Sequence, residues 1–289
     1  MTRIAIPMPH SRDLQYGERA VAQYERAVAL LGGEPVRVPL DRSLAEVRTI
    51  IENCQGVLLP GSNADVDPAK FHQERSAHSA VADARREDVD WLLLDHAYAQ
   101  RKPVLGICYG LQSLNVYRRG SLVQHIPEFL PEATRKRVNH EAGGKVAVAH
   151  SVEIEWQSKL AAILRNGSLR HGREGRGFRS EPALSEQSAS KGASGTATEK
   201  VVADTPGLML HVNSSHHQSA DAVGDGLRIV ARCPEDGIVE ALEGTSADHF
   251  VLSVQWHPER SVEDDEASRV IFRALIETAE QRHDAVPRP

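Results

Sequence analysis

The sequence predicts an α/β fold in which a central, mostly parallel sheet is flanked by helices on both faces. Three observations lead to this prediction. Short apolar runs alternate with helical patterns through the first 120 or so residues. The runs at 56–60 and 104–107 are apolar at nearly every position, as expected for strands buried on both faces. From about residue 145 strand-like runs become more frequent, and we expect them to add a smaller antiparallel element.

In the first half, expected strands and helices follow each other in turn. Gly32-Gly33 ends the first helix, and Ser43 with Glu46 three residues later forms a capping box that opens the second. The expected strands cover 4–8, 36–39, 56–60 and 104–107, and the expected helices cover 18–31, 43–53, 84–100 and the segment after Cys108.

The second half is expected to contain strands at 145–155, 227–231, 238–242 and 250–256, and a closing helix at 264–279. Residues 172–204 differ from the rest, because Ser, Ala and Gly dominate and few side chains could enter a core. We interpret this segment as a flexible insertion, with a substrate lid as the alternative. The chain is therefore expected to form one domain over 1–283, followed by a tail at 284–289.

Composition excludes several classes of protein. The net charge of −6 argues against a general nucleic-acid surface, and no apolar run is long enough to cross a membrane. The three scattered cysteines fit a reducing compartment and, with no signal-peptide core at the N-terminus, predict a cytoplasmic protein. No phosphate-binding glycine motif is present, so no nucleotide cofactor is expected.

Cys108 is the candidate nucleophile. It lies in Gly106-Ile-Cys-Tyr-Gly110, between an expected strand and an expected helix. Small residues on both sides of a reactive residue allow a sharp turn from strand to helix, the geometry of a nucleophile elbow. The free backbone N–H groups at the start of the helix favour a thiolate there.

His257 and Glu259 are the candidate partners of this cysteine. The expected strand at 250–256 delivers His257 at its end, and Pro258 keeps the backbone there out of the helical conformation. Glu259 can then hold one tautomer of the imidazole. A covalent intermediate also needs an oxyanion hole, for which we expect the backbone N–H of Tyr109 together with that of Gly61 or Ser62.

These residues together resemble the class I glutamine amidotransferase superfamily, and most of all its γ-glutamyl-γ-aminobutyrate hydrolase branch, peptidase family C26. The resemblance covers nearly the whole chain outside 172–204, and it implies a flavodoxin-like sandwich. It also implies that Cys108 is the nucleophile, His257 the general base and acid, and Glu259 the orienting carboxylate. The residues that carry it are the blocks at 58–68, 86–90, 106–112, 212–218 and 255–259.

The same resemblance implies that four further residues bind the glutamyl part of a substrate, namely Gln112, Ser214, His216 and His217. Two departures from the family pattern bear on function. The turn at 60–64 is one residue longer than usual, and Tyr109 stands where the hydrolase branch often has Arg. The histidines show no recognisable metal-ligand spacing, so neither a metal nor a cofactor is expected.

Three functions remain open at this point. The first is a cysteine-dependent hydrolase of γ-glutamyl amide bonds that works through a γ-glutamyl thioester on a small-molecule substrate. The second, indicated by Tyr109, is a glutaminase component that supplies ammonia to a separate synthetase. The third is a non-enzymatic redox sensor or binding module built around Cys108. A homodimer is the default expectation for the assembly.

Overall fold

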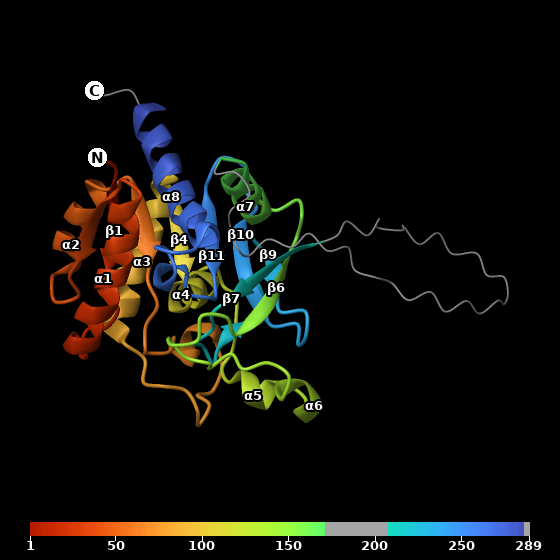
Figure 1. Ribbon diagram of the computed structural model, residues 1–289. Coiled ribbons are helices and arrows are strands. Elements are labelled where there is room, and N and C mark those ends of the chain that lie inside the picture. The colour runs from red at the N-terminus through yellow and green to blue at the C-terminus, as the bar shows by residue number, and fades with distance from the viewer. Residues whose placement is uncertain (171–206, 286–289) are drawn as a thin grey trace, which may run out of the picture.

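The computed structural model describes residues 1–170 and 207–285 (Figure 1). The expected insertion at 172–204 and the end of the tail, 286–289, lie outside the described residues. The described part has a mixed sheet with helices on both sides and a small separate pair of strands.

Among the described residues, the main sheet has nine strands in the order β2-β1-β3-β4-β11-β10-β9-β6-β7. The first five are parallel, and the following four are antiparallel to their neighbours. A two-stranded antiparallel sheet pairs β5 with β8. The expected fold class is therefore confirmed, including the antiparallel element. The strands are β1 (Arg3–Pro7), β2 (Glu34–Val38), β3 (Gly56–Leu59), β4 (Val104–Ile107), β5 (Leu122–Val123), β6 (His150–Ile154), β7 (Leu208–Val212), β8 (Ser219–Ala220), β9 (Leu227–Arg232), β10 (Val239–Gly244) and β11 (Val251–Val254).

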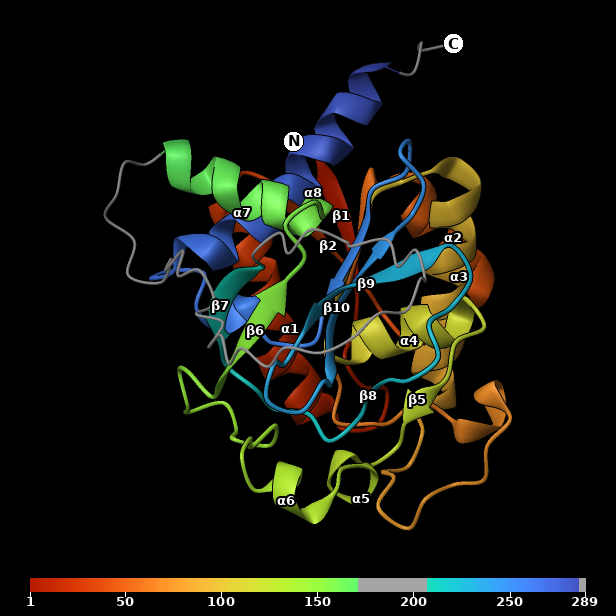
Figure 2. The ribbon, with the colours of Figure 1, turned by 90° about the vertical axis from the view of Figure 1, so that its right-hand side faces the viewer.

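Helices form two groups that lie on opposite sides of the sheet (Figure 2). One group contains α1 and α7, which both pack against α8, and the other contains α2 and α4, which both pack against α3. The helices are α1 (Leu14–Leu30), α2 (Leu44–Glu52), α3 (Ala84–Gln100), α4 (Tyr109–Tyr117), α5 (Ile126–Phe129), α6 (Glu132–Arg135), α7 (Lys159–Arg170) and α8 (Glu266–Ala285), with short 3-10 turns η1 (Pro68–Phe71) and η2 (Pro258–Arg260).

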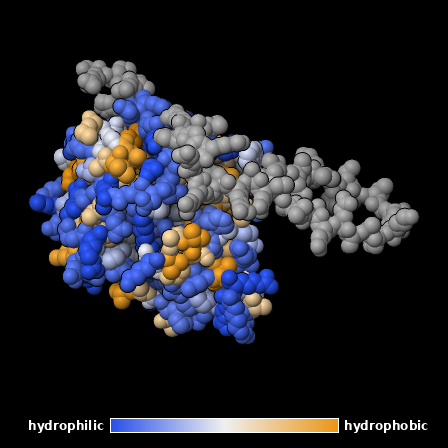
Figure 3. Space-filling model, in the orientation of Figure 1, coloured by the Kyte–Doolittle hydropathy of each residue, from blue (hydrophilic) through white to orange (hydrophobic). Residues whose placement is uncertain are grey.

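Local sequence explains several of these elements. The capping box at α2 is present, because Ser43 Oγ accepts from the Glu46 amide and Glu46 accepts from the Ser43 amide. All residues of β3 and β4 are buried, since helices cover both faces of the sheet, and this explains their continuous apolar sequences. Hydrophilic residues prevail on the face in Figure 3, where hydrophobic ones form small separate groups. In the described ranges, no helix combines the length and apolarity needed to cross a membrane.

The strand expected at 145–155 is shorter than its alternating sequence suggested. Only 150–154 pairs in the sheet, as β6, and residues 145–149 form an irregular segment. Val146 and Val148 are 38% and 57% exposed and line a cavity of about 610 Å³ that is also bordered by Leu210 and Trp256. Residues 144–148 all line this cavity, so the alternating sequence does not mark one face of a strand here. Helix α7 and strand β7 were not expected from the sequence.

Candidate active site

Three neighbouring parallel strands end at the same edge of the sheet and carry the candidate residues. Gly61 follows β3, Cys108 follows β4 and His257 follows β11. Because β4 lies between β3 and β11, the three connecting segments are adjacent beyond the carboxyl ends, where sites form in sheets of this kind. The backbone N–H of Cys108 donates to Val254 O at 2.8 Å, which ties the end of β4 to the end of β11.

Cys108 has a backbone conformation that side chains rarely adopt, with φ of 53° and ψ of −106°. The neighbouring glycines make this turn possible. A methyl group at Gly110 would lie 2.1 Å from Leu59 O, and one at Gly106 would lie 2.8 Å from the Gly110 backbone. Helix α4 begins directly afterwards at Tyr109. The thiol is thus held at the junction of strand and helix, as the elbow interpretation requires.

His257 faces both a carboxylate and the cysteine. Its Nδ1 lies 2.7 Å from Glu259 Oε1, whereas its Nε2 is buried and has no hydrogen-bond partner among the described residues. A methyl group at Gly61 would lie 3.2 Å from His257 Cε1 and 3.6 Å from Cys108 Cβ, so the imidazole and the cysteine meet over this glycine. Burial opposes a charge on His257, but Glu259 and Cys108 together raise its pKa to about 9.

The backbone amides expected to form the oxyanion hole differ in whether they already donate a hydrogen bond. The Gly61 amide donates to Tyr24 Oη at 3.0 Å, so that amide is already occupied. Within the described residues, the amides of Ser62 and Tyr109 donate to no protein acceptor. Ser62 Oγ donates to Pro9 O at 2.8 Å and fixes the turn. The sequence left Gly61 and Ser62 open as the second oxyanion donor beside Tyr109. Of these two, Ser62 has the amide that is free to bind an oxyanion.

Two tyrosines of α1 belong to the surroundings of the site, although sequence reasoning did not select them. Burial and the nearby Cys108 raise the pKa of Tyr16 to about 12. Tyr24 is buried, and burial followed by the charge of Glu259 raises its pKa well above the usual range. Both phenols therefore stay protonated at neutral pH. Their spacing of eight residues places them on one face of a helix, which is the signal that could have revealed them.

Arg86 is a buried residue that holds together several segments around the candidate site. Its fully buried guanidinium pairs with Asp90 Oδ1 at 2.7 Å and donates to Pro60 O at 2.8 Å and Pro9 O at 3.1 Å. It also lies over the ring of Tyr109, 4.9 Å from the centroid. One charged group thus fixes the turn after β3, the segment after β1 and the first side chain of α4.

Asn213 holds the backbone of His257, and this role was also missed. Its Nδ2 donates to His257 O and its Oδ1 accepts from the His257 amide, both at 2.9 Å. The side chain therefore reproduces a strand-like pair of hydrogen bonds at the residue that follows β11. Its place in the 212–218 block was the available signal.

The four residues expected to bind substrate have separate surroundings. Gln112 donates to Gln218 O at 3.2 Å, and the buried Ser214 donates to His140 O at 2.8 Å. His216 is 4% exposed and faces Glu240. His217 keeps 24% of its side chain exposed and lies 3.1 Å from Asp65 Oδ1. Their contact with a substrate stays a prediction.

Comparison with known proteins identifies the family of this chain. The family model of peptidase C26 matches residues 5–171 and 179–259, so the chain belongs to the peptidase C26 family, as the resemblance predicted. It is 28% identical to a glutamine amidotransferase-like protein of Rickettsia prowazekii, over 89% of this chain and 87% of that protein. It is 30% identical to the gamma-glutamyl-gamma-aminobutyrate hydrolase PuuD of Escherichia coli K12, over 91% and 87% of the two chains. The solved glutaminase domain of Trypanosoma brucei CTPS shares the fold, with a TM-score of 0.54 and 17% identity over 96% of this chain and 94% of that one.

Proposed function

We propose that this protein hydrolyses γ-glutamyl amide bonds, such as that of γ-glutamyl-γ-aminobutyrate or a related γ-glutamyl amine, and releases glutamate. Membership of peptidase C26 supports hydrolysis of an amide bond. The likeness to PuuD over nine-tenths of the chain supports the γ-glutamyl substrate class. The observation that carries the proposal is the unpartnered Nε2 of His257, oriented by Glu259 and positioned beside Cys108.

The proposed reaction begins with Cys108. Its thiolate attacks the γ-carbonyl carbon, and a carbon–sulfur bond forms while the carbonyl oxygen becomes an oxyanion. The backbone amides of Ser62 and Tyr109 stabilise this charge, because neither amide has a protein acceptor. His257 then donates its Nε2 proton to the leaving nitrogen, the carbon–nitrogen bond breaks, and a γ-glutamyl thioester remains.

The second half of the reaction reverses the role of His257. The imidazole, now neutral, takes a proton from a water molecule as that water attacks the thioester. The carbon–sulfur bond breaks, glutamate leaves, and the thiolate–imidazolium pair is restored. Glu259 keeps the proton on Nδ1 throughout, so that Nε2 is always the nitrogen that exchanges protons with substrate.

The test is a panel of γ-glutamyl amines assayed for free glutamate with wild type, Cys108→Ala and Cys54→Ala. Cys54 is a matched control, because it is a second buried thiol that donates to Ile50 O in α2, outside the candidate site. We expect Cys108→Ala to lose at least about 10³-fold in kcat/KM, whereas Cys54→Ala keeps its activity. Wild-type turnover by Cys108→Ala would show the mechanism to be wrong.

A glutaminase that supplies ammonia to a synthetase is the second candidate, and Tyr109 favours it. The aromatic ring is fully buried against Arg86 and offers no charged group to a substrate. Glutamine assayed beside γ-glutamyl-γ-aminobutyrate separates the two functions. A kcat/KM that is higher for the larger amide supports the hydrolase, and a strong preference for glutamine supports the glutaminase.

A further inference from the structure

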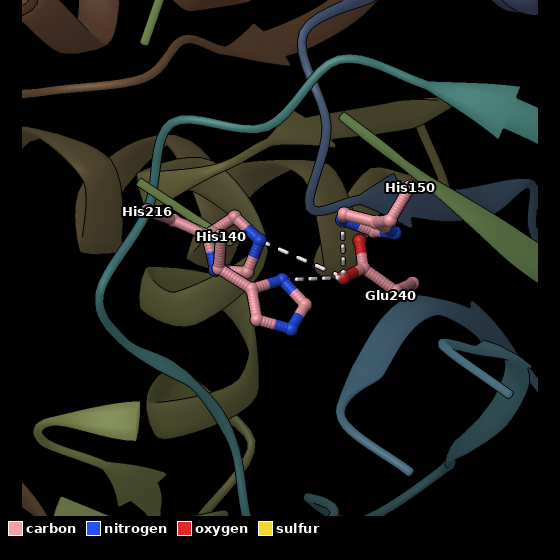
Figure 4. A group of neighbouring side chains, drawn as sticks. All are labelled: His140, His150, His216 and Glu240. Atoms are coloured by element: carbon pink, nitrogen blue, oxygen red, sulfur yellow. Dashed lines mark ion pairs between the residues drawn. The ribbon is translucent and has the colours of Figure 1, made fainter. Parts of the chain in front are cut away.

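Four buried side chains converge outside the candidate active site (Figure 4). They are His140 from the segment before β6, His150 at the start of β6, His216 from the loop between β7 and β8, and Glu240 in β10. Glu240 is fully buried, and the three histidines are at most 8% exposed. A charged side chain in the interior of a strand is costly unless a counter-charge or a metal compensates it.

The three imidazoles point at one carboxylate oxygen. Glu240 Oε1 lies 3.4 Å from His140 Nδ1, 3.4 Å from His150 Nε2 and 3.6 Å from His216 Nε2. All four donor atoms lie within 4.8 Å of one another. The three distances to Glu240 Oε1 exceed an ordinary hydrogen bond and lie close to those between ligands of a single ion, since atoms bound to tetrahedral zinc at roughly 2.0–2.1 Å lie roughly 3.3–3.4 Å apart.

The outer nitrogens of the same imidazoles are all engaged. His140 Nε2 lies 2.8 Å from Asp236 Oδ2, His216 Nδ1 lies 2.9 Å from Gln218 O, and His150 Nδ1 lies 3.1 Å from Ser151 O. Because these oxygens only accept, each outer nitrogen carries the proton. The other ring nitrogens, which we call the inner nitrogens, face Glu240 and are His140 Nδ1, His150 Nε2 and His216 Nε2. In a neutral imidazole, each inner nitrogen then directs a lone pair at Glu240.

A nitrogen lone pair and a carboxylate oxygen that face each other with no proton between them repel each other. The inner nitrogens of all three histidines and both oxygens of Glu240 are buried and have no hydrogen-bond partner. One cation at the centre converts this repulsion into four bonds. Asp236 would then serve as the outer partner that orients His140, an arrangement typical of histidine ligands.

We propose that His140, His150, His216 and Glu240 form a structural binding site for a divalent transition-metal ion, best suited to Zn²⁺. Nitrogen and carboxylate ligands in tetrahedral array favour zinc over calcium or magnesium, which prefer oxygen. All four positions come from the protein, which defines a closed site. With three neutral imidazoles, Glu240 and Asp236 balance the charge of one divalent ion.

The ion would brace the segment that positions His257. His216 and Asn213 belong to the same loop, and Asn213 clamps the backbone of His257. His140 O also accepts from the His216 amide at 2.9 Å and from Ser214 Oγ. A cavity of about 190 Å³ lined by His140 and His216 offers an entry path.

The first test measures metal in wild-type protein that carries no polyhistidine tag. We expect about one equivalent of a transition metal per chain after purification without chelator, or after incubation with Zn²⁺ and desalting. A strong chelator should lower Tm, and Zn²⁺ but not Mg²⁺ should restore it. Less than about 0.1 equivalent after Zn²⁺ incubation, with no change in Tm, would overturn the proposal.

Variants locate the ion. Glu240→Gln and His150→Gln should lose it, whereas the control His211→Gln should keep it, because His211 is an exposed histidine of β7 that pairs with Ser151 next to the site. Asp236→Asn leaves all four ligands in place and should weaken Zn²⁺ affinity about 10–100-fold. Equal metal content in wild type, Glu240→Gln and Asp236→Asn would contradict the assignment, even if His150→Gln fails to fold.

The proposed metal site and the proposed hydrolysis can be refuted independently of each other. Cys108→Ala should keep its full metal content while losing turnover, since Cys108 is not one of the four ligands. Metal bound by inactive protein would support the ion and not the reaction, and turnover by protein that never binds metal would support the reaction and not the ion.

Discussion

Asn213 grips the backbone of His257 through both ends of its side-chain amide, at 2.9 Å in each direction. The imidazole is therefore positioned from two sides, through its own backbone by Asn213 and through its ring by Glu259. Neither contact involves substrate. In the proposed reaction, both contacts hold Nε2 where it exchanges protons with a group bound at Cys108.

Replacing Asn213 tests this positioning role. Asn213→Ala removes both hydrogen bonds and should lower kcat for a γ-glutamyl amide about 10–100-fold with little change in KM, because a small displacement of His257 spoils proton transfer without affecting binding. Steady-state kinetics provide the measurement. The control is Asn166→Ala, an exposed residue of α7. An unchanged kcat in Asn213→Ala would mean that these two hydrogen bonds are not needed to position His257 for proton transfer.

The backbone strain at Cys108 should appear in unfolding experiments. With φ of 53° and ψ of −106°, alanine is disfavoured and glycine is not. Cys108→Gly should therefore be about 1–2 kcal/mol more stable than Cys108→Ala in denaturant titrations, although both are inactive. Ala20→Gly, at a helical position of α1, should have the opposite sign and destabilise by about 1 kcal/mol. An equal stability of the two Cys108 variants would refute the strain.

The pH dependence of the reaction should follow His257. Its folded pKa of about 9 lies above the ordinary 6.5, because Glu259 and Cys108 outweigh burial. The stability gained from its proton is thus fully present below pH 6.5 and is lost as pH rises through about 9. We expect kcat/KM to fall on an alkaline limb near pH 9, where the imidazolium that must protonate the leaving amine disappears.

Glu259→Gln should move that limb. Removing the carboxylate lowers the pKa of His257, so activity should be lost at lower pH, and the maximal rate should fall about 10²–10⁴-fold. The pH–rate profile of the variant, compared with wild type, provides the measurement. A limb that stays near pH 9 in Glu259→Gln would assign it to another group.

The Arg86–Asp90 pair should be essential for stability. Both side chains are fully buried, so Asp90→Ala leaves an uncompensated guanidinium and should cost about 3–5 kcal/mol in the free energy of unfolding. The exposed pair of Lys136 with Glu132 is the matched control, and Glu132→Ala should cost less than about 1 kcal/mol. Similar losses in the two variants would show that burial does not distinguish these pairs.

The sequence predicted the parts of the molecule that depend on local pattern. Helix α3 and strand β4 begin and end where expected, at 84–100 and 104–107, because buried strands and capped helices leave continuous signals. Cys108 and His257 were predicted to be partners because a nucleophilic cysteine needs a base and because the family resemblance pairs them. The order β4-β11, which the sequence did not predict, places the ends of their strands side by side.

Contacts made across the sheet could not be predicted in the same way. The three histidines around Glu240 are brought together by the order β10-β9-β6-β7, and no fixed spacing along the chain records it. We expected no metal from the spacing of the histidines, and the proposed site depends entirely on this order. Asn213 and Tyr24 act through backbone groups of distant residues, so the sequence signals that mark the two residues do not reveal which groups they contact.

The position of β11 has a consequence for the nascent chain. This strand is inserted between β4 and β10, although more than 140 residues separate it from β4 in sequence. The strands on the two sides of this position can therefore be joined through β11 only after it has been synthesised. His257 follows β11, so its imidazole can approach the thiol of Cys108 only after that strand has entered the sheet.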